Sequence, residues 1–503
     1  MPKIGLDFGT SYSFTSFLHG SQVQPLVQRE EQYGIPSVYF RDSAGGEHFG
    51  RDAIQAARSR PLMLVTSIKQ KMRLKEIDLG DGRAASPEEI MTSIAGYVLQ
   101  VAETRLARDY PDETGDIEVV VAYPVEFGEN QRAMIERAVA NCTLTGGGHP
   151  KIISMIPEPV AAAIDYFGLM PAIGENILVC DLGGGTFDCA LVQSVTEGNV
   201  PYKVIDQEGI QVGGDDWDAA FANWIKGKFE ADGGTLSRRA EADLMPNARD
   251  SKIILSSSES TFHCITIGDD IWELKVTRDD FEACTRKQLE DVMSAVAKMK
   301  SRAKVAINQV ILVGGGSKMP MFEKGIRKIF PDMGSRIRIY NPENSISYGA
   351  ARYAASYEPK PLSLMSNDAE PSVDKMIELK STHNYGIRYF KNAESEEKGV
   401  WILIRKGDTL PVKSTIESST RNKGSFSKYD VFETTEEPDA DGWVDPDKAS
   451  MVISFEFDFG LEVEAGTKCV DTLVLNESNL LEIRVINPKT GKRHSEVKVV
   501  RKI

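Results

Sequence analysis

The first 130 residues alternate between short apolar runs and one long amphipathic stretch. Apolar runs of strand length occupy Lys3–Asp7, Ser13–Leu18, Ser37–Phe40 and Ile117–Ala122. Between them, the residues from about Pro87 to Arg108 have a helical period and open with Ser-Pro-Glu-Glu, which is typical of a helix start. Short strands around a long helix predict an α/β arrangement.

The same arrangement returns in the middle of the chain. We expect strands within Asn176–Val195 and at Gln309–Val313, and a helix-rich region from Asp216 to Ser301. The last of these strands runs into Gly-Gly-Gly and a further helix. The sequence therefore predicts two α/β halves.

The composition changes after about Pro359. Pro, Ser, Asp and Lys dominate as far as Lys380, and β-prone segments without a long helical period follow. These segments are Gly399–Ile404, Met451–Phe459, Thr472–Leu475, Leu480–Ile486 and Ser495–Val500. We expect a separate β-rich domain on a linker, with the acidic stretch Glu433–Asp447 as a surface loop.

Composition and charge narrow the classes of function. A chain of 503 residues with 41% hydrophobic residues is long enough for about three domain-sized units. Its net charge of −15 would repel a polyphosphate backbone, so nucleic-acid binding is not expected. The chain has no apolar run of the ~20 residues that a membrane helix needs and no signal-peptide pattern, which predicts a soluble, cytoplasmic protein without a membrane partner. The six cysteines are scattered, so neither disulfides nor a zinc site is expected.

One motif occurs twice, once in each half. Ile4–Ser11 reads Ile-Gly-Leu-Asp-Phe-Gly-Thr-Ser, and Ile177–Asp188 repeats its order of apolar strand, Asp and glycine turn with a hydroxyl. Glycines let backbone N–H groups approach phosphate oxygens, and an Asp beside the turn can hold Mg²⁺ through water. A hairpin turn explains a single copy equally well. Two copies in matching halves favour an ATP cleft with one clamp on each side.

A third glycine turn follows the strand Val310–Val313. It reads Gly-Gly-Gly-Ser-Lys and leads into a helix. Such a turn lets a flat ligand lie against bare backbone, although strand–glycine–helix turns are common in α/β folds. The chain lacks the Gly-x-x-x-x-Gly-Lys-Ser/Thr sequence, which excludes a P-loop.

In order and spacing, these three turns resemble the two phosphate motifs and the adenosine motif of the actin, sugar-kinase and heat-shock superfamily. Further stretches are similar specifically to the 70-kDa heat-shock chaperones: Gly34–Ser37, Ile68–Lys69, Phe127–Arg132, Ile156–Ala163, Gly213–Asp218 and Asn341–Glu343. The resemblance covers about residues 3–355. It implies an α/β fold, a two-lobed actin-like ATPase of duplicated ribonuclease H-like fold, followed by a β-sandwich domain.

The resemblance also implies domain boundaries. We expect an ATPase domain at residues 1–358, a linker at 359–382 and a β-rich, substrate-binding-like domain at 383–503. Val373–Lys380 resembles the family's short hydrophobic linker, but Glu378 interrupts its apolar core, which we expect to soften its docking. The chain ends directly after the last β segment, so we expect the family's helical lid to be absent. A β-domain can hold an extended peptide through its edges and loops, and a scaffold or docking module is the alternative.

Roles in catalysis follow from the same resemblance, because phosphoryl transfer asks the protein mainly for positioning and charge stabilisation. Asp7 and Asp181 match the family's metal-shell acids, which hold Mg²⁺ through water. Lys69 matches the lysine that contacts the γ-phosphate and the attacking water. The alternative for Lys69 is a solvated surface lysine.

Three further residues match the family's water and cation network. Thr186 resembles the hydroxyl that faces the γ-phosphate, Asp188 the acid beside it, and Glu158 an acid of the same network. The alternatives are a turn cap for Asp188 and an ordinary acid at a helix N-terminus for Glu158.

Nucleotide-binding residues are implied in the three turns, two further segments and one helix: Gly9, Thr10, Ser11, Tyr12, Gly183, Gly184, Gly185, Gly213, Gly214, Asp215, Lys252, Ser256, Gly314, Gly315, Gly316, Ser317, Lys318 and Glu343. Some positions depart from the family pattern. Arg249 replaces the ribose-binding acid, for which Asp250 is a substitute, and Lys318 replaces an Arg that stacks on adenine. Ser11 replaces a second Thr but keeps the hydroxyl. We expect a nucleotide affinity below the family norm.

Pro124 and Arg132 match an allosteric relay that reports the nucleotide state in the family. Here Glu126 places an acid beside the proline, which we expect to change the strength of the relay.

The leading expectation is a slow, chaperone-type ATPase. It would bind and hydrolyse ATP between two α/β lobes and couple the nucleotide state to peptide or partner binding by the β-domain. The implied ligands are ATP or ADP with Mg²⁺, with K⁺ as a further candidate cation. The implied partners are a client protein or extended peptide and a co-chaperone or nucleotide exchange factor. The alternatives are a small-molecule kinase using the same cleft and an actin-like filament or scaffold protein, and the linker with its β-rich tail argues against both.

Overall fold

The computed structural model describes residues 1–503 except 27–33, 81, 114, 171–173, 196–200, 268–269, 358–376, 393, 395, 477–480, 488 and 498–503. The chain forms two compact units. The first comprises Met1–Glu126, Ile135–Tyr202 and Gln207–Met376, and the second comprises Phe127–Met134, Lys203–Asp206 and Ile377–Ile503. Within the described ranges, no helix is both long and apolar enough to cross a membrane.

The N-terminal part of the first unit builds one mixed sheet, in the strand order β10-β9-β1-β2-β3 with β4 also paired to β2. The bounds are β1 (Lys3–Phe8), β2 (Tyr12–His19), β3 (Gln22–Pro25), β4 (Ile35–Pro36), β9 (Glu118–Tyr123) and β10 (Lys151–Pro157). β10, β9 and β1 are parallel, whereas β1, β2 and β3 form antiparallel pairs. Every residue of β9 is buried, as expected of a central parallel strand.

A second sheet of the first unit repeats this plan, in the order β17-β16-β11-β12-β13. The bounds are β11 (Asn176–Leu182), β12 (Phe187–Ser194), β13 (Tyr202–Ile210), β16 (Gln309–Val313) and β17 (Ile337–Ile339). β17, β16 and β11 are parallel, and β11 and β12 are antiparallel. β11 and β12 thus correspond to β1 and β2, and the prediction of two α/β halves is confirmed.

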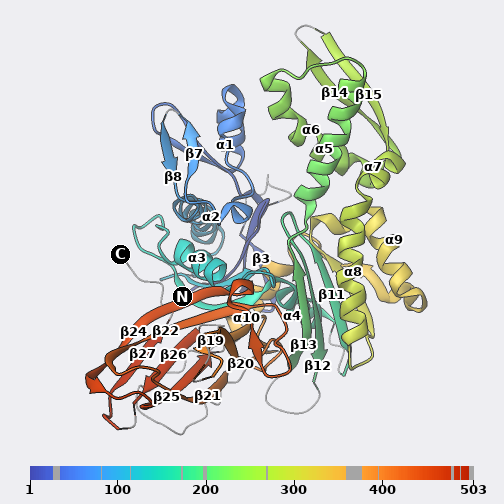
Figure 1. Cartoon of the computed structure of the whole chain (residues 1–503). Coiled ribbons are helices and arrows are strands. Elements are labelled where there is room, and N and C mark those ends of the chain that lie inside the picture. Colours follow the sequence, from blue (N-terminus) through green and yellow to red (C-terminus); the bar gives the residue numbers. More distant parts are fainter. Residues whose placement is uncertain are drawn as a thin grey trace. The chain divides into compact units, whose positions relative to one another are not determined.

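Helices and short hairpins surround the two sheets (Figure 1). The helices are α1 (Gly50–Ala56), η1 (Ala57–Ser59), η2 (Pro61–Met63), η3 (Ile68–Lys71), α2 (Pro87–Asp109), α3 (Glu129–Ala140), α4 (Glu158–Leu169), α5 (Gly214–Ala231), α6 (Arg238–Ser257), α7 (Arg278–Cys284), α8 (Arg286–Arg302), η4 (Gly315–Lys318), α9 (Pro320–Ile329), η5 (Pro331–Arg336) and α10 (Ser345–Ser356). The hairpins are β5 (Tyr39–Arg41) with β6 (Glu47–Phe49), β7 (Ile77–Gly80) with β8 (Arg83–Ala85), and β14 (Ser260–Ile267) with β15 (Asp270–Thr277).

Two helices join the sheets. α10 packs against β1 and β2 and against α4, which itself contacts β11 and β12. A Cβ at Gly349 of α10 would lie only 1.7 Å from the carbonyl oxygen of Ala161 in α4, so the two helices pack backbone to backbone. We call the first sheet with α1, α2, η1 to η3 and the hairpins β5–β6 and β7–β8 the first lobe. The second lobe is the second sheet with α5 to α9 and the hairpin β14–β15.

The helix predicted from about Pro87 to Arg108 is α2, and a capping box starts it. The Ser86 hydroxyl accepts the N–H of Glu89 at 3.2 Å, and the Glu89 carboxylate accepts the N–H of Ser86 at 2.7 Å.

The region Asp216–Ser301 is less helical than expected, because β14 and β15 interrupt it. Along β14, exposed and buried residues alternate from Phe262 to Thr266. The residue types do not follow this burial pattern, because Phe262 is exposed and His263 is buried, so β14 gave no clear alternating signal in the sequence.

The second unit consists mainly of two antiparallel sheets, drawn in orange to red in Figure 1. One has the strand order β23-β20-β19-β22-β24 and the other the order β21-β25-β26-β27. The bounds are β19 (Asn384–Phe390), β20 (Lys398–Ile404), β21 (Val412–Ser419), β22 (Gly424–Thr434), β23 (Trp443–Val444), β24 (Ser450–Val463), β25 (Lys468–Leu475), β26 (Leu481–Ile486) and β27 (Arg493–Val497), with the short helix η6 (Pro446–Lys448). All five predicted β segments overlap strands.

The acidic stretch Glu433–Asp447 is not only a loop. It contains the end of β22 and the strand β23, in which Trp443 pairs with Trp401 of β20. The indole rings of these two residues pack edge to face at 4.9 Å. An apolar residue pair therefore anchors this acidic stretch to the sheet.

Most of the predicted linker lies outside the described residues. Its described end forms β18 (Ile377–Glu378), which pairs with β13. Glu378 makes an ion pair with Lys203 at 3.6 Å within the second unit. The acid that interrupts the apolar core of the linker thus has a basic partner.

Candidate active site

The two copies of the repeated motif meet in the first unit. Gly9, Thr10 and Ser11 form the turn between β1 and β2, and Gly183–Gly185 lie in the turn between β11 and β12. A Cβ at Gly184 would lie 2.3 Å from Ser11 Oγ, and a Cβ at Gly185 would lie 2.8 Å from Thr10 Oγ1. The turns face each other in contact, and a Cβ at either glycine would displace the hydroxyl side chain opposite to it.

Four carboxylates lie beside these turns. Asp7 is near the end of β1, Asp181 near the end of β11, Asp188 at the start of β12 and Glu158 at the start of α4. Asp181 and Asp188 are direct cross-strand partners, and all four are at most 6% exposed. Burial and the nearby Glu158 raise the pKa values of Asp7 and Asp188 to about 8, and the same causes raise the pKa of Asp181 well above its usual range.

Lys69 supplies the positive charge within this group. Its Nζ lies 3.0 Å from Glu158 Oε1, and its positive charge lowers the pKa values of Asp7 and Asp181 against the effect of burial. Lys69 is only 3% exposed, so the alternative of a solvated surface lysine is wrong. Glu158 likewise belongs to a buried ion pair and is not simply an acid at a helix start.

The carboxylates fit a cation that is held through water. Among the described side chains, Asp181 Oδ1 and Asp188 Oδ2 are buried without a hydrogen-bond partner. Across the same described ranges, no three His, Cys, Asp or Glu residues converge closely enough to hold a metal ion directly. Mg²⁺ keeps several water ligands and needs only one or two carboxylates, which matches these two observations.

Thr186 and Glu126 hold Asp188 in place. The Thr186 side chain and the Glu126 N–H, 3.3 Å from Asp188 Oδ1, both stabilise the charged form of Asp188 and lower its pKa against the effect of burial. Since Glu126 follows β9, Asp188 does more than cap its own turn. The Glu126 N–H is a contact that sequence reasoning missed, because a backbone donor leaves no signal in the sequence.

The start of α5 packs against the second glycine turn and bonds to its backbone. The N–H groups of Gly214 and Asp215 donate to the carbonyl oxygens of Gly183 (2.9 Å) and Gly184 (2.8 Å). A Cβ at Gly213 would lie 2.5 Å from the backbone of Gly185. The predicted nucleotide segment Gly213–Asp215 is therefore packed directly on the second glycine turn.

The third glycine turn lies against Asp181. Gly314 has φ +77°, and a Cβ there would lie 2.3 Å from Asp181 Oδ1. A Cβ at Gly315 would meet nothing within 4 Å, so this side of the turn is open. The Ser317 hydroxyl donates to Gly314 O at 2.7 Å and serves the turn itself. Tyr12, at the start of β2, is 38% exposed.

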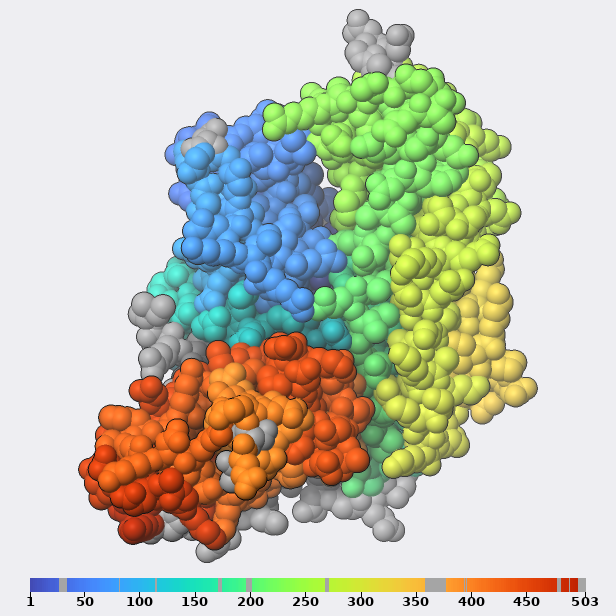
Figure 2. Space-filling model, in the orientation of Figure 1, coloured from blue at the N-terminus to red at the C-terminus, as the bar shows by residue number. Residues whose placement is uncertain are grey.

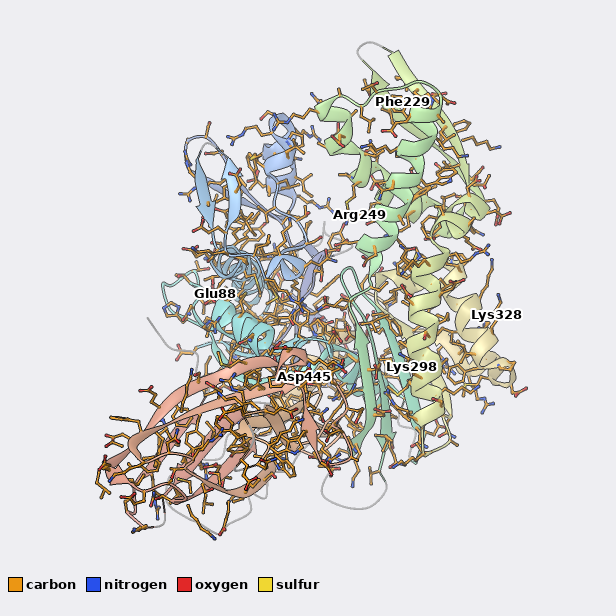
Figure 3. All side chains as sticks on the ribbon, viewed as in Figure 1. Glu88, Phe229, Arg249, Lys298, Lys328 and Asp445 are labelled. Atoms are coloured by element: carbon orange, nitrogen blue, oxygen red, sulfur yellow. The ribbon has the colours of Figure 1, made fainter. Side chains whose placement is uncertain are left out.

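Side chains on α6 complete the candidate adenosine side. Lys252 Nζ donates to Gly214 O at 3.0 Å and pairs with Asp218 at 2.6 Å. Arg249, labelled in Figure 3, binds Asp215 at 2.7 Å and Asp218 at 2.6 Å. The Ser256 hydroxyl donates to Lys252 O at 3.1 Å within its own helix.

Two departures from the family pattern thus have structural partners. Arg249 is neutralised by two carboxylates, and Lys318 forms an ion pair with Glu343. Asp218, which unites Arg249 with Lys252, was missed by sequence reasoning. It lies in the recognised Gly213–Asp218 segment, so its acid was a usable signal.

Figure 2 shows a hollow between the blue first lobe and the green second lobe.

The predicted relay residues fall in different units. Pro124 is buried in the first unit. Arg132 belongs to the second unit, where it is 3% exposed and donates to Thr382 Oγ1 (2.9 Å), Tyr385 Oη (2.6 Å) and Glu129 Oε2 (2.8 Å). These contacts make Arg132 part of the β-domain's packing and leave the relay a prediction.

Comparisons with known proteins agree with this architecture. The family model described as Hsp70 protein matches residues 46–415. The chaperone protein DnaK of Mycoplasmoides gallisepticum is 29% identical over 367 residues, which cover 69% of this chain and 59% of that relative. The chaperone protein DnaK of Akkermansia muciniphila is 28% identical over 393 residues, which cover 70% of this chain and 58% of that relative. The chain thus spans less than two thirds of the length of these relatives.

The family match extends over most of the chain and includes the second and third glycine turns, Lys69 and the carboxylates from Glu158 to Asp188, whereas Asp7 and the first glycine turn lie before the matched residues. The two-lobed, actin-like α/β fold followed by a β-sandwich is the architecture of this family. The chain belongs to the Hsp70 family.

Proposed function

We propose that this chain binds ATP with Mg²⁺ between the two lobes and hydrolyses it slowly. The observation that carries the proposal is the gathering of four buried carboxylates and one buried lysine where two glycine turns meet. A buried cluster with excess negative charge is costly unless a cation neutralises it, and the orphaned oxygens of Asp181 and Asp188 mark where that charge is uncompensated.

Each part of the cluster has a proposed task. The N–H groups of the glycine turns bind the phosphates, and Asp7 and Asp181 would hold Mg²⁺ through water. When bound, the ion neutralises phosphate charge. Lys69, fixed by Glu158, donates to the γ-phosphate and to the attacking water and stabilises the charge that develops there.

The remaining residues orient the water and the nucleotide. Glu158 and Asp188 accept hydrogen bonds from the attacking water, and the Thr186 hydroxyl faces the γ-phosphate. The open face at Gly315 receives the adenine ring, with Lys252 beside it on α6. Because Arg249 is a donor without acceptor capacity, the ribose hydroxyls have a weaker partner than a carboxylate, and a modest ATP affinity is expected.

For the second unit we propose binding of an extended peptide or client protein, with the nucleotide state as its control. A pocket of about 450 Å³ lies beside β23 and is lined by Lys391, Glu397, Lys398, Glu436, Glu437, Asp439, Trp443, Val444, Asp445, Pro446 and Lys448. Most of these side chains are charged, which favours polar segments of a client over apolar ones. We keep the boundaries 1–358, 359–382 and 383–503 as proposals.

A single incubation with Mg·ATP tests the enzymatic part. Slow phosphate release without an added acceptor is the expected result. ADP formation only in the presence of a small-molecule acceptor would instead indicate a kinase, and ATP-dependent light scattering would indicate a filament protein. Capture of bound polypeptides from the ADP form and from the ATP form tests the chaperone part.

A further inference from the structure

Ser67 has a backbone conformation that serine rarely adopts. Its φ of 51° and ψ of 45° lie in the left-handed region, which is costly for residues other than glycine. Ser67 directly precedes η3, yet its hydroxyl makes no capping bond to that helix. The hydroxyl donates instead to Asp215 Oδ2 at 2.5 Å. A strained conformation persists where surrounding contacts enforce it and often marks a functional position.

Asp215 connects three elements. Its Oδ2 accepts from Ser67, its Oδ1 accepts from Arg249 Nη2 at 2.7 Å, and its N–H donates to Gly184 O at 2.8 Å. Asp215 is 5% exposed. Both carboxylate oxygens therefore have protein partners, which hold the Asp215 side chain in place from two sides, and its contact with the nucleotide stays a prediction.

The bond between Ser67 and Asp215 joins the two lobes. Ser67 belongs to the first lobe and is two residues before Lys69, whereas Asp215 belongs to the second lobe and is bonded to its glycine turn. Lys69 is held on its other side by Glu158 at 3.0 Å. The short helix η3 is thus tied to the second glycine turn at one end and to α4 through its lysine.

We propose that Ser67 and Asp215 are positioning residues, and that their hydrogen bond across the lobes sets the place of Lys69 relative to the second glycine turn. This inference rests on the proposed ATPase function. Opening of the lobes breaks the bond, so Lys69 is correctly placed only when the lobes are closed. Catalysis falls steeply when a charged group is displaced by about 1 Å, which gives one hydrogen bond outside the reacting groups a large effect.

The substitution Ser67→Gly separates positioning from folding. Glycine adopts a φ of 51° without strain and lacks the hydroxyl, so the relief of strain offsets part of the lost hydrogen bond and the melting temperature should stay close to that of wild type. The single-turnover rate of hydrolysis of bound Mg·ATP should fall about tenfold or more, the usual effect of losing a hydrogen bond to a charged acceptor. The affinity for ATP should change by less than about threefold, because the bond acts on the transition state. Ser67→Asn should restore most of the rate, since Asn tolerates the left-handed region and its amide can donate to Asp215.

The outcomes distinguish this proposal from the proposed function. A wild-type chain that neither binds nor hydrolyses ATP would remove the proposed function itself. A wild-type chain that hydrolyses ATP, with Ser67→Gly hydrolysing it at the same rate, would overturn the positioning role alone. An equal loss in Ser67→Asn and Ser67→Gly would also overturn it, because the donor would then not matter. In an Asp215→Ala background, Ser67→Gly should have no further effect, and an additive loss would contradict a shared bond.

Discussion

Asp181 and Asp188 lie directly opposite each other on β11 and β12, with both carboxylates buried. Each has one oxygen without a hydrogen-bond partner among the residues that the structure describes. Their negative charges are reinforced by Asp7 and Glu158, and Lys69 offsets only part of them. The site is therefore a source of instability in the ligand-free protein.

The first prediction concerns the buried carboxylates of this site. Mg·ADP should raise the melting temperature, and EDTA should reverse this rise. With Mg·ADP at 100 times its Kd, the free energy of unfolding should increase by about 2.7 kcal/mol. Asp188→Asn replaces a buried carboxyl of raised pKa by a neutral amide of nearly the same shape, so it should raise the melting temperature of the ligand-free protein and slow hydrolysis. Differential scanning fluorimetry with and without Mg·ADP measures both. An Asp188→Asn variant that melts below wild type without ligand would show that the charge is not costly.

The second prediction concerns the role of Lys69 in hydrolysis. Lys69→Ala should lower the hydrolysis rate by about 10²–10³ because a fixed cation at the transferring phosphate is lost, while much of the ATP binding remains. Asp181→Ala should abolish hydrolysis through loss of the cation site. The exposed Lys75 offers the matched control, and Lys75→Ala should behave as wild type. Unchanged turnover in Lys69→Ala would exclude this lysine from the mechanism.

The third glycine turn provides a pair of neighbouring substitutions with opposite expectations. Gly314→Ala places a Cβ 2.3 Å from Asp181 Oδ1 at a φ of +77°, so it should destabilise the fold by at least ~1–2 kcal/mol and abolish ATP binding. Gly315→Ala meets no protein atom within 4 Å and should leave the ligand-free melting temperature unchanged. It should nevertheless weaken ATP binding if the nucleotide lies on this turn. Wild-type affinity in Gly315→Ala, measured by titration calorimetry, would place the adenine elsewhere.

The fourth prediction concerns pH and His383. This histidine is 5% exposed, and its Nδ1 shares a hydrogen bond of 2.8 Å with the hydroxyl of Thr382, which accepts from Arg132. Burial and the positive charges of Arg132 and Lys406 hold the pKa of His383 well below its usual value.

The direction of the pH effect follows from this shift. Below about pH 6.5 the unfolded chain takes up a proton at His383, whereas the folded chain does not. The free energy of unfolding should therefore decrease as the pH is lowered, by up to ~1.4 kcal/mol per pH unit. Urea midpoints at pH 7.5, 6.5 and 5.5 should show a smaller loss in His383→Gln than in wild type. His19→Gln, at an exposed histidine of the first unit, is the control. Equal pH slopes in wild type and His383→Gln would exclude His383 as the origin.

The proposed domain boundary gives the fifth prediction. A chain truncated to residues 1–358 should fold and bind ATP, because all the glycine turns, Lys69 and the carboxylates precede residue 358. It should be less stable than the full chain, since Arg132 and Glu129 lose Thr382, Tyr385 and Glu433 as partners. Because Arg132 keeps its ion pair with Glu129 in the truncated chain, restored stability in an Arg132→Leu version would identify the lost hydrogen bonds of the guanidinium to Thr382 and Tyr385 as the cause. An insoluble truncated chain that no substitution rescues would show that the boundary is misplaced.

Much of the architecture is visible in the sequence because it depends on local pattern. The glycine turns, the helix α2 and most strands of the β-domain have a clear period or a turn that demands glycine. The hairpin β14–β15 was missed because the residue types of β14 do not follow its alternation of exposed and buried positions.

Contacts across long sequence separations were not predictable in the same way. Ser67 carries no sign of its left-handed conformation, and its partner Asp215 is 148 residues away. Arg249 departed from the family pattern, yet only the structure shows that Asp215 and Asp218 neutralise it. Pairings of this kind depend on how elements that are distant in the sequence pack together, which no local pattern encodes.

The membership of Phe127–Met134 in the second unit has a consequence for synthesis on the ribosome. Arg132 is made 250 residues before its partner Thr382, which corresponds to roughly 12–50 s of translation. During this interval Thr382, Tyr385 and Glu433, which bond to Arg132 and Glu129 in the folded chain, have not yet been made, and the start of α3 is without its final packing. The nascent chain therefore passes through a state in which most of the nucleotide-binding part has been made. In this state the segment Phe127–Met134 cannot yet pack against the C-terminal strands.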